Sequence, residues 1–163
     1  EGSLAIGSTG TETPDTVDVA VTSGKVYQLH KQTFPALDMG TGDDIHVVND
    51  SSTLYKTVMD LGNEQLDANG NTLNNTSYSL VVWGIMNKTG EMSHLMVNLP
   101  TDSYSFALSS QATADANGYS VYTIPAVFKG VGFLIARFTL TLKNNENVLI
   151  ETDQQIVVES KIL

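Results

Sequence analysis

The sequence predicts a mostly β protein: an antiparallel, jelly-roll-like β-sandwich with one short helix near residues 105–117. Three observations carry this prediction. Charged residues make up only 16% of the chain, against about 25% in an average globular protein, and Thr, Ser and Asn take their place. Apolar and polar residues alternate in short runs, as they do in half-buried strands. No helical pattern separates successive strands, which argues against a parallel α/β sheet.

The chain of 163 residues has the length of a single ordinary domain. Residues 1–15 are small and polar apart from Leu4-Ala5-Ile6, and a segment with so little to bury is expected to be an arm or linker. The other strand patterns all fall within residues 16–163. We therefore expect an N-terminal arm followed by one β domain.

Short strand patterns separated by polar turns fill the first half of the chain. Alternating valines over 17–21 predict a strand, and Ser23-Gly24 predicts a hairpin turn into a second strand over 25–30. Apolar runs at 45–48 and 54–59 predict two further strands. The polar residues between these runs are typical of turns.

The second half contains the clearest hairpin, in which residues 78–86 and 91–99 flank the turn at 87–90. Residues 105–117 are rich in alanine and lack internal Gly and Pro, which predicts the helix. Further strands are expected at 119–124, 133–142, 148–151 and 155–159.

Charge excludes two classes of partner. The net charge is −10, and Arg137 is the single arginine. Nucleic-acid binding needs clustered Lys and Arg that neutralise phosphates, and no such cluster occurs. An anionic membrane surface is disfavoured for the same reason. No apolar run approaches the ~20 residues that a membrane-spanning helix needs. The sequence therefore predicts neither nucleic acid nor membrane as a partner.

The side chains that usually bind metals are few and scattered. There is no cysteine. His30, His46 and His94 each lie on a different predicted strand, and no two have a local ligand spacing. Residues 67–71 faintly resemble a calcium loop, but an Asn-Gly turn explains them without an ion. We expect no metal and no cofactor.

Catalytic motifs are also missing from the pattern. Neither a Gly-x-Ser-x-Gly elbow nor a phosphate-binding loop occurs, and most acidic residues lie in turn-like contexts, such as Asp43-Asp44 with Asp50. The sequence thus predicts a structural or binding module with no catalytic residues. A hydrolase stays open as an alternative, because paired carboxylates meet only in the folded chain.

Aromatic residues leave two interpretations open. Exposed rings stack on sugars, whereas buried rings pack in a core. Trp83 lies in an apolar run and suits the core. The tyrosines are Tyr27, Tyr55, Tyr78, Tyr104, Tyr119 and Tyr122. The pattern alone does not assign a ligand-binding residue among them.

Two stretches carry a resemblance to a known group of proteins. One is Leu80–Glu91, which reads LVVWGIMNKTGE. The other combines Asn98-Leu99-Pro100 with Tyr104 and residues 119–125 and 132–137. Together they resemble C-terminal regions of tail-fibre-like and other virion-associated proteins of environmental bacteriophages. The resemblance covers residues 26–142 and consists of apolar strand patterns, so it transfers no functional residue.

The resemblance implies a module on the virion surface, outside the cell, at the tip of a tail or head fibre. Such modules are commonly homotrimers that contact a host-cell receptor or another virion protein. In this chain we expect Leu4-Ala5-Ile6 or the strand within 131–142 at the subunit interface. The alternative is a secreted bacterial carbohydrate-binding module that acts as a monomer through exposed aromatic residues.

Overall fold

The structure is a computed structural model, and it describes residues 4–8, 16–27, 31–53, 55–85, 94–101, 105–107, 112, 126, 132–143 and 146–154. These residues lie mostly in strands, so the mostly β class is confirmed. Within these ranges no helix reaches seven residues. Two 3-10 turns occur, η1 (Met39–Thr41) and η2 (Leu61–Asn63).

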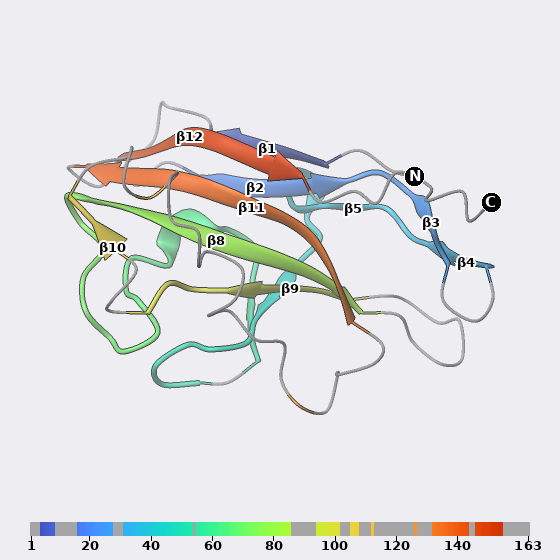
Figure 1. The fold of residues 1–163 in the computed structure, drawn as a ribbon, viewed down its shortest axis with the longest axis horizontal. Coiled ribbons are helices and arrows are strands. Elements are labelled where there is room, and N and C mark those ends of the chain that lie inside the picture. Colours follow the sequence, from blue (N-terminus) through green and yellow to red (C-terminus); the bar gives the residue numbers. More distant parts are fainter. Residues whose placement is uncertain are drawn as a thin grey trace, which may run out of the picture.

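The largest sheet has the spatial order β12-β11-β8-β9-β6-β7, and β10 also pairs with β8 (Figure 1). Its strands are β6 (Ile45–Val47), β7 (Lys56–Val58), β8 (Thr76–Ile85), β9 (His94–Asn98), β10 (Ser105–Phe106), β11 (Gly132–Lys143) and β12 (Glu146–Gln154). The β6–β9 pair is parallel, and the other described pairs are antiparallel. The sheet is therefore mixed, and the jelly-roll-like sandwich stays a prediction.

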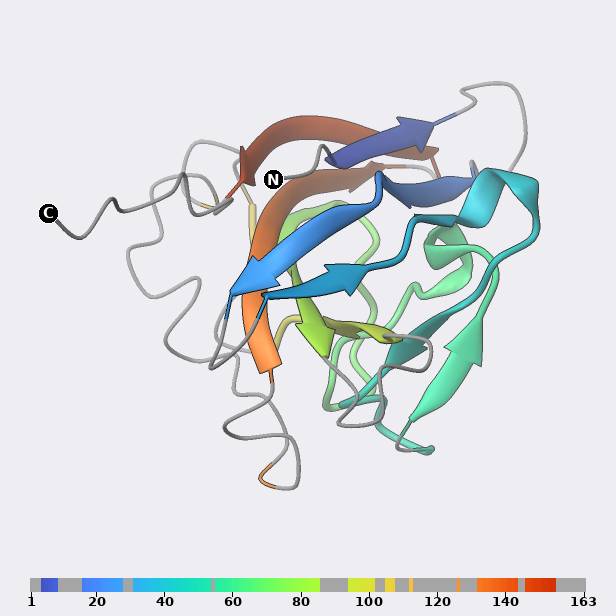
Figure 2. The ribbon, with the colours of Figure 1, turned by 90° about the vertical axis from the view of Figure 1, so that its right-hand side faces the viewer.

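Two smaller sheets complete the described part of the fold. The first has the order β1-β2-β5, and the second is the hairpin β3–β4. Their strands are β1 (Leu4–Ser8), β2 (Val17–Val21), β3 (Gly24–Tyr27), β4 (Lys31–Phe34) and β5 (Leu37–Asp38). Strand β1 lies beside β12 of the large sheet in both ribbon views (Figures 1 and 2).

The hydrophobic core lies between the three-stranded sheet and one face of the large sheet. Val17, Val19 and Val21 of β2 are buried and alternate with half-buried residues, as the period-two pattern predicts. They belong to the same buried cluster as side chains from five strands of the large sheet. Those partners include Ile45, Val47, Val58, Leu80, Val82, Leu95, Val97, Phe138, Leu140 and Leu142.

The antiparallel pairing of the two segments of the predicted hairpin is confirmed by β8 and β9, with Val82 opposite Val97 and Trp83 opposite Met96. The turn predicted at 87–90 lies outside the described residues. Asn49 extends the adjoining parallel pair past the end of β6. Its Nδ2 donates to the Leu99 carbonyl at 2.9 Å, and the Leu99 N–H donates to its Oδ1 at 2.7 Å. The side-chain amide thus replaces the next residue of the ladder.

The hairpin predicted at Ser23-Gly24 is wrong. Strand β2 is paired on one edge with β1 and on the other with β5, so neither edge accepts β3. Strand β3 pairs with β4 instead. The Ser23-Gly24 pair thus predicted where β2 ends, but not which strands pair with β2.

The helix predicted near 105–117 is contradicted at its start. Ser105 and Phe106 form β10 and pair with Tyr78 and Ser77 of β8. The unpaired length of β8 beyond β9 provides backbone partners for this segment, and they outweigh its modest helix propensity. Ala112, further along the predicted helix, is helical, and apart from it and Ala107 the remaining residues of this segment lie outside the described ranges.

The segment 1–15, predicted as an arm, contributes β1 to the fold. Residues Leu4–Ser8 pair in register with β2, with Ile6 opposite Val19. The predicted strands at 119–124 and 155–159 lie outside the described residues. The run at 133–142 is strand β11, and the run at 148–151 lies within β12.

Candidate binding surface

Aspartates organise the loops that precede β8. Asp38, Asp50, Asp60 and Asp67 each accept a hydrogen bond from the backbone N–H two residues further on, at 3.0, 2.9, 2.7 and 2.8 Å. The donors are Gly40, Ser52, Gly62 and Asn69. This is the Asx-turn arrangement, in which a short side chain satisfies the backbone of a tight turn. These carboxylates therefore act as structural acceptors.

The loop at 67–71 is a turn, as its Asn-Gly sequence predicts. The Asp67 side chain is buried, and Oδ1 accepts from the N–H groups of Asn69 and Asn71, both at 2.8 Å. The Asn71 amide donates to Oδ2 at 3.1 Å. Gly70 has a φ of 86°, which glycine adopts without strain. The Asp67 oxygens thus face donors of their own loop.

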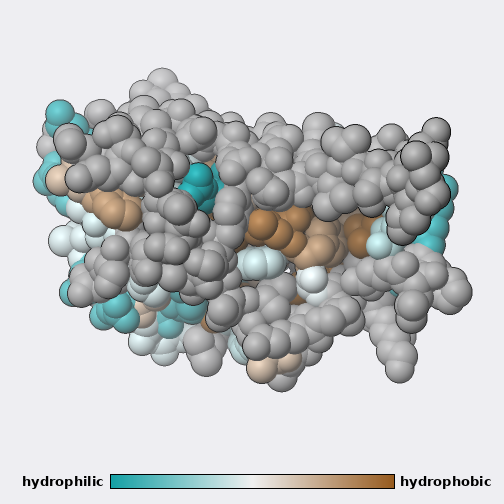
Figure 3. Space-filling view, viewed as in Figure 1, coloured by the Kyte–Doolittle hydropathy of each residue, from teal (hydrophilic) through white to brown (hydrophobic). Residues whose placement is uncertain are grey.

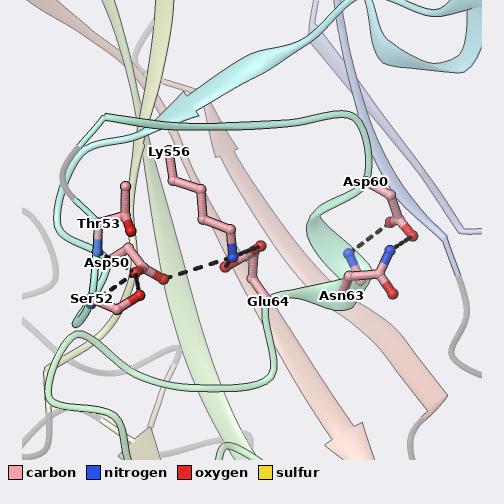
Figure 4. Close-up of polar contacts among 8 residues, drawn as sticks. Asp50, Ser52, Thr53, Lys56, Asp60, Asn63 and Glu64 are labelled. Atoms are coloured by element: carbon pink, nitrogen blue, oxygen red, sulfur yellow. Dashed lines mark hydrogen bonds and ion pairs between the residues drawn. The ribbon is translucent and has the colours of Figure 1, made fainter.

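Lys56 joins two of these loops (Figure 4). Its Nζ lies 2.7 Å from Glu64 Oε1 and 3.8 Å from Asp50 Oδ2. The Glu64 side chain is only 7% exposed, so the ion pair is shielded on the carboxylate side. The N–H of Ser52 in particular, with help from Thr53 and Lys56, holds the pKa of Asp50 below its ordinary value. The segment 50–56 is therefore fixed at both ends.

Strand β7 and the two residues that flank it carry an exposed, uncharged strip, which we define as Tyr55, Thr57 and Met59. Burial alternates along this segment, since Val58 is buried and all three residues of the strip are exposed. Tyr55 is 43% exposed and Met59 is 61% exposed. Tyr55 also has a φ of 59°, an unusual backbone conformation for a bulky residue.

The strip continues across the outer face of the large sheet, which is the face opposite the core. Thr57, His46, Met96 and Trp83 are successive cross-strand partners on β7, β6, β9 and β8. Thr57 Oγ1 lies 3.1 Å from His46 Nδ1. Trp83 packs with a second buried cluster of Val48, Ile85 and Met96. Apolar atoms also gather over the middle of the view in Figure 3, where Figure 1 draws β8, β9 and β11.

Trp83 is half-buried rather than fully in the core, and its Nε1 donates to Asn98 Oδ1 at 2.8 Å. Further along this face, hydroxyls pair across β8 and β11, with Ser77 Oγ 2.7 Å from Thr141 Oγ1.

Tyr78 lies in the core, and burial raises the pKa of its hydroxyl far above the ordinary range. Of the remaining tyrosines described, Tyr27 and Tyr55 are exposed.

No cluster of histidines occurs among the described residues. His46 contacts Thr57, and His94 occupies the register position opposite Ile85 at the start of β9. His30 lies outside the described residues. In the described ranges no group of three or more His, Asp or Glu side chains is arranged to hold a metal ion. The same part of the chain contains no helix long and apolar enough to cross a bilayer.

Sequence reasoning did not find the Lys56–Glu64 pair or the backbone conformation of Tyr55. Lys56 and Glu64 are eight positions apart in the sequence, and only the folded loop brings them together. From sequence, Tyr55 could be either exposed or packed in the core, and the structure shows that it is exposed. The alternation of Thr57, Val58 and Met59 was the available signal, because it predicts which side of β7 faces solvent.

A second group of acids, Asp18, Asp38 and Asp60, lies near the start of β2. Asp60 Oδ1 accepts from the Val17 N–H at 2.8 Å, which brings it next to Asp18. Burial raises the pKa of Asp18 above its ordinary value, and the charges of Asp60 and Asp38 raise it further. A raised folded-state pKa means that ionised Asp18 destabilises the fold.

Asp18→Asn is therefore expected to stabilise the protein at pH 7 by about 0.5 kcal/mol, a size typical of interactions between partly exposed charges. The folded chain binds the Asp18 proton more tightly than the unfolded chain does, so the destabilisation develops as pH rises above 3.8 and is absent below it. Urea unfolding at pH 7 and pH 3 measures this. Replacing exposed Asp44 by Asn is the control, and an equal gain at both pH values contradicts the prediction.

Comparison with protein-family models, curated proteins and solved structures finds no match to this chain.

Proposed function

We propose that the chain is a non-catalytic module of a bacteriophage virion surface, at the tip of a tail or head fibre, that assembles as a homotrimer and contacts a host-cell receptor. The observation that carries the proposal is that charged and uncharged side chains of the loops before β8 have different surroundings. Their aspartates turn towards the backbone, while uncharged Tyr55 and Met59 point into solvent. The sequence resemblance over residues 26–142 and the mostly β fold agree with it.

The acids of these loops support a binding role over a catalytic one. A general acid or base needs an oxygen that can reach the substrate. Asp60 accepts hydrogen bonds from the N–H groups of Val17 and Gly62, and Asp67 is satisfied within its own turn. Glu64 is held by Lys56. Groups committed in this way rigidify loops, and rigid loops lose less conformational entropy when they bind a partner.

The two segments expected at the subunit interface are both used within the fold. Strand β1 pairs with β2, and β11 is paired with β8 on one edge and with β12 on the other. Backbone pairing between subunits through β11 is therefore unavailable. In the proposed trimer β11 contributes side-chain contacts, whereas β1, the edge strand of its described sheet, can also contribute its backbone.

Light scattering after size-exclusion chromatography tests the assembly. The proposal expects a particle of three times the 17.5 kDa chain mass, unchanged on dilution. A monomer at every concentration contradicts it. A monomer that binds polysaccharide would instead favour the second candidate, a secreted bacterial carbohydrate-binding module. The exposed ring of Tyr55 and the half-buried ring of Trp83 support this candidate, because aromatic rings stack on sugars.

A further inference from the structure

We propose that Tyr55 is the stacking platform of a site for an uncharged sugar ring, completed by Thr57, Met59 and His46 at the β6–β7 side of the large sheet. The inference rests on the proposed receptor-binding function and names the class of receptor, a neutral cell-surface glycan. Three features of the described residues carry it: the conformation of Tyr55, the make-up of the strip and the local charge.

The conformation of Tyr55 is held against its own preference. A left-handed backbone costs a residue with a side chain about 1–2 kcal/mol, and such strain persists where the surroundings impose it. Here Asp50 accepts from the N–H groups of Ser52 and Thr53 on one side of Tyr55. On the other side Lys56 is tied to Glu64. The loop thus keeps Tyr55 in a strained backbone conformation that leaves its ring 43% exposed and outside both buried clusters.

The strip offers the two kinds of contact that a sugar needs. The C–H face of a pyranose stacks on an aromatic ring, while its hydroxyls exchange hydrogen bonds with polar groups beside the ring. Tyr55 supplies the ring, and the thioether of exposed Met59 supplies a second apolar contact. Thr57 Oγ1 and His46 Nδ1, 3.1 Å apart, supply neighbouring polar atoms on the same face.

Local charge selects an uncharged ligand. The three residues of the strip carry no formal charge, and the nearby Lys56 ammonium is neutralised by Glu64 and Asp50. The net charge of −10 repels sulfated, sialylated or phosphorylated polymers. A neutral glycan meets no such barrier, so it is the occupant that the surface fits best.

The test compares binding of the full chain and two variants to immobilised dextran, mannan and galactan, with hyaluronan as the anionic polysaccharide. We expect the unmodified chain to bind at least one neutral polymer and not hyaluronan. Tyr55→Gly is expected to weaken binding at least about tenfold, which corresponds to ~1.4 kcal/mol. Tyr27→Ala removes a 58% exposed tyrosine from β3 and is expected to bind like the unmodified chain.

The glycine variant separates binding from folding. Glycine adopts a positive φ freely, so Tyr55→Gly is expected to keep or raise the thermal unfolding midpoint while it loses the ligand. No binding to any of the three neutral polymers, full binding by Tyr55→Gly, equal losses in both variants, or a preference for hyaluronan would each overturn the inference. A trimer without glycan binding overturns the sugar site alone, whereas a glycan-binding monomer overturns the fibre assignment alone.

Discussion

Replacing Asp67 by alanine is expected to lower the free energy of unfolding by about 3 kcal/mol, because it removes a buried carboxylate that accepts hydrogen bonds from three N–H donors of its own loop. The Asp67 side chain is 1% exposed. Its carboxylate accepts from the N–H groups of Asn69 and Asn71 and from the Asn71 side-chain amide. Water cannot easily replace an acceptor at a buried position, so the loss exceeds that of an exposed turn. Urea unfolding followed by circular dichroism measures it.

Asp67→Asn is the matched control, since its side-chain oxygen can still accept from the two backbone N–H groups. We expect it to lose about 1 kcal/mol, because hydrogen bonds to a charged acceptor are stronger than those to a neutral one. Added calcium chloride should not raise the unfolding midpoint of the unmodified chain. A calcium-dependent rise, or an alanine variant as stable as the asparagine variant, would contradict the structural role of this carboxylate.

Local patterns predicted what depends on local chemistry. The alternation of Val17, Val19 and Val21 predicted both the strand and its buried face, since side chains alternate across a pleat. Asn69-Gly70 predicted the turn, because its conformation needs a residue that tolerates positive φ. Antiparallel pairing between strands that follow each other in the chain also followed from sequence, as β8 and β9 show.

Pairing between distant segments could not be predicted in this way. The parallel pair of β6 and β9 joins segments with β7 and β8 between them in the chain, and no residue type marks such a neighbour. The partner of β2 was missed because its edges are taken by β1 and β5. Register between remote strands depends on the total packing of the core, which a single sequence does not display.

The candidate surface was predictable only in part. Exposure of Thr57 and Met59 follows from alternation around buried Val58. The positive φ of Tyr55 does not follow, because tyrosine disfavours it and the contacts of Asp50 and Lys56 on either side of it form only in the folded loop. Such a departure from local preference is expected at functional sites, which is a further reason to test this residue first.

Gly84→Ala is expected to destabilise the protein by about 2 kcal/mol, within the range seen when cores are overpacked. Gly84 lies on β8 directly opposite Phe133 of β11. A Cβ at this glycine would lie 2.4 Å from the tip of the Phe133 ring, far inside contact distance. Moving the ring away would give up its edge-on packing against Phe34, whose ring centroid lies 5.3 Å from its own. Thermal and urea unfolding measure the loss.

A double-mutant cycle with Phe133→Ala distinguishes this clash from a general intolerance of side chains in β8. Phe133→Ala alone leaves a gap beside Phe34 and lowers stability. In its presence the new methyl group of Gly84→Ala enters space that the ring occupied, so the second change should cost little or even stabilise. We expect a coupling of at least about 1 kcal/mol. Strict additivity would mean that the aromatic ring does not limit residue 84, and that β8 and β11 are held in register by their backbone and the remaining core alone.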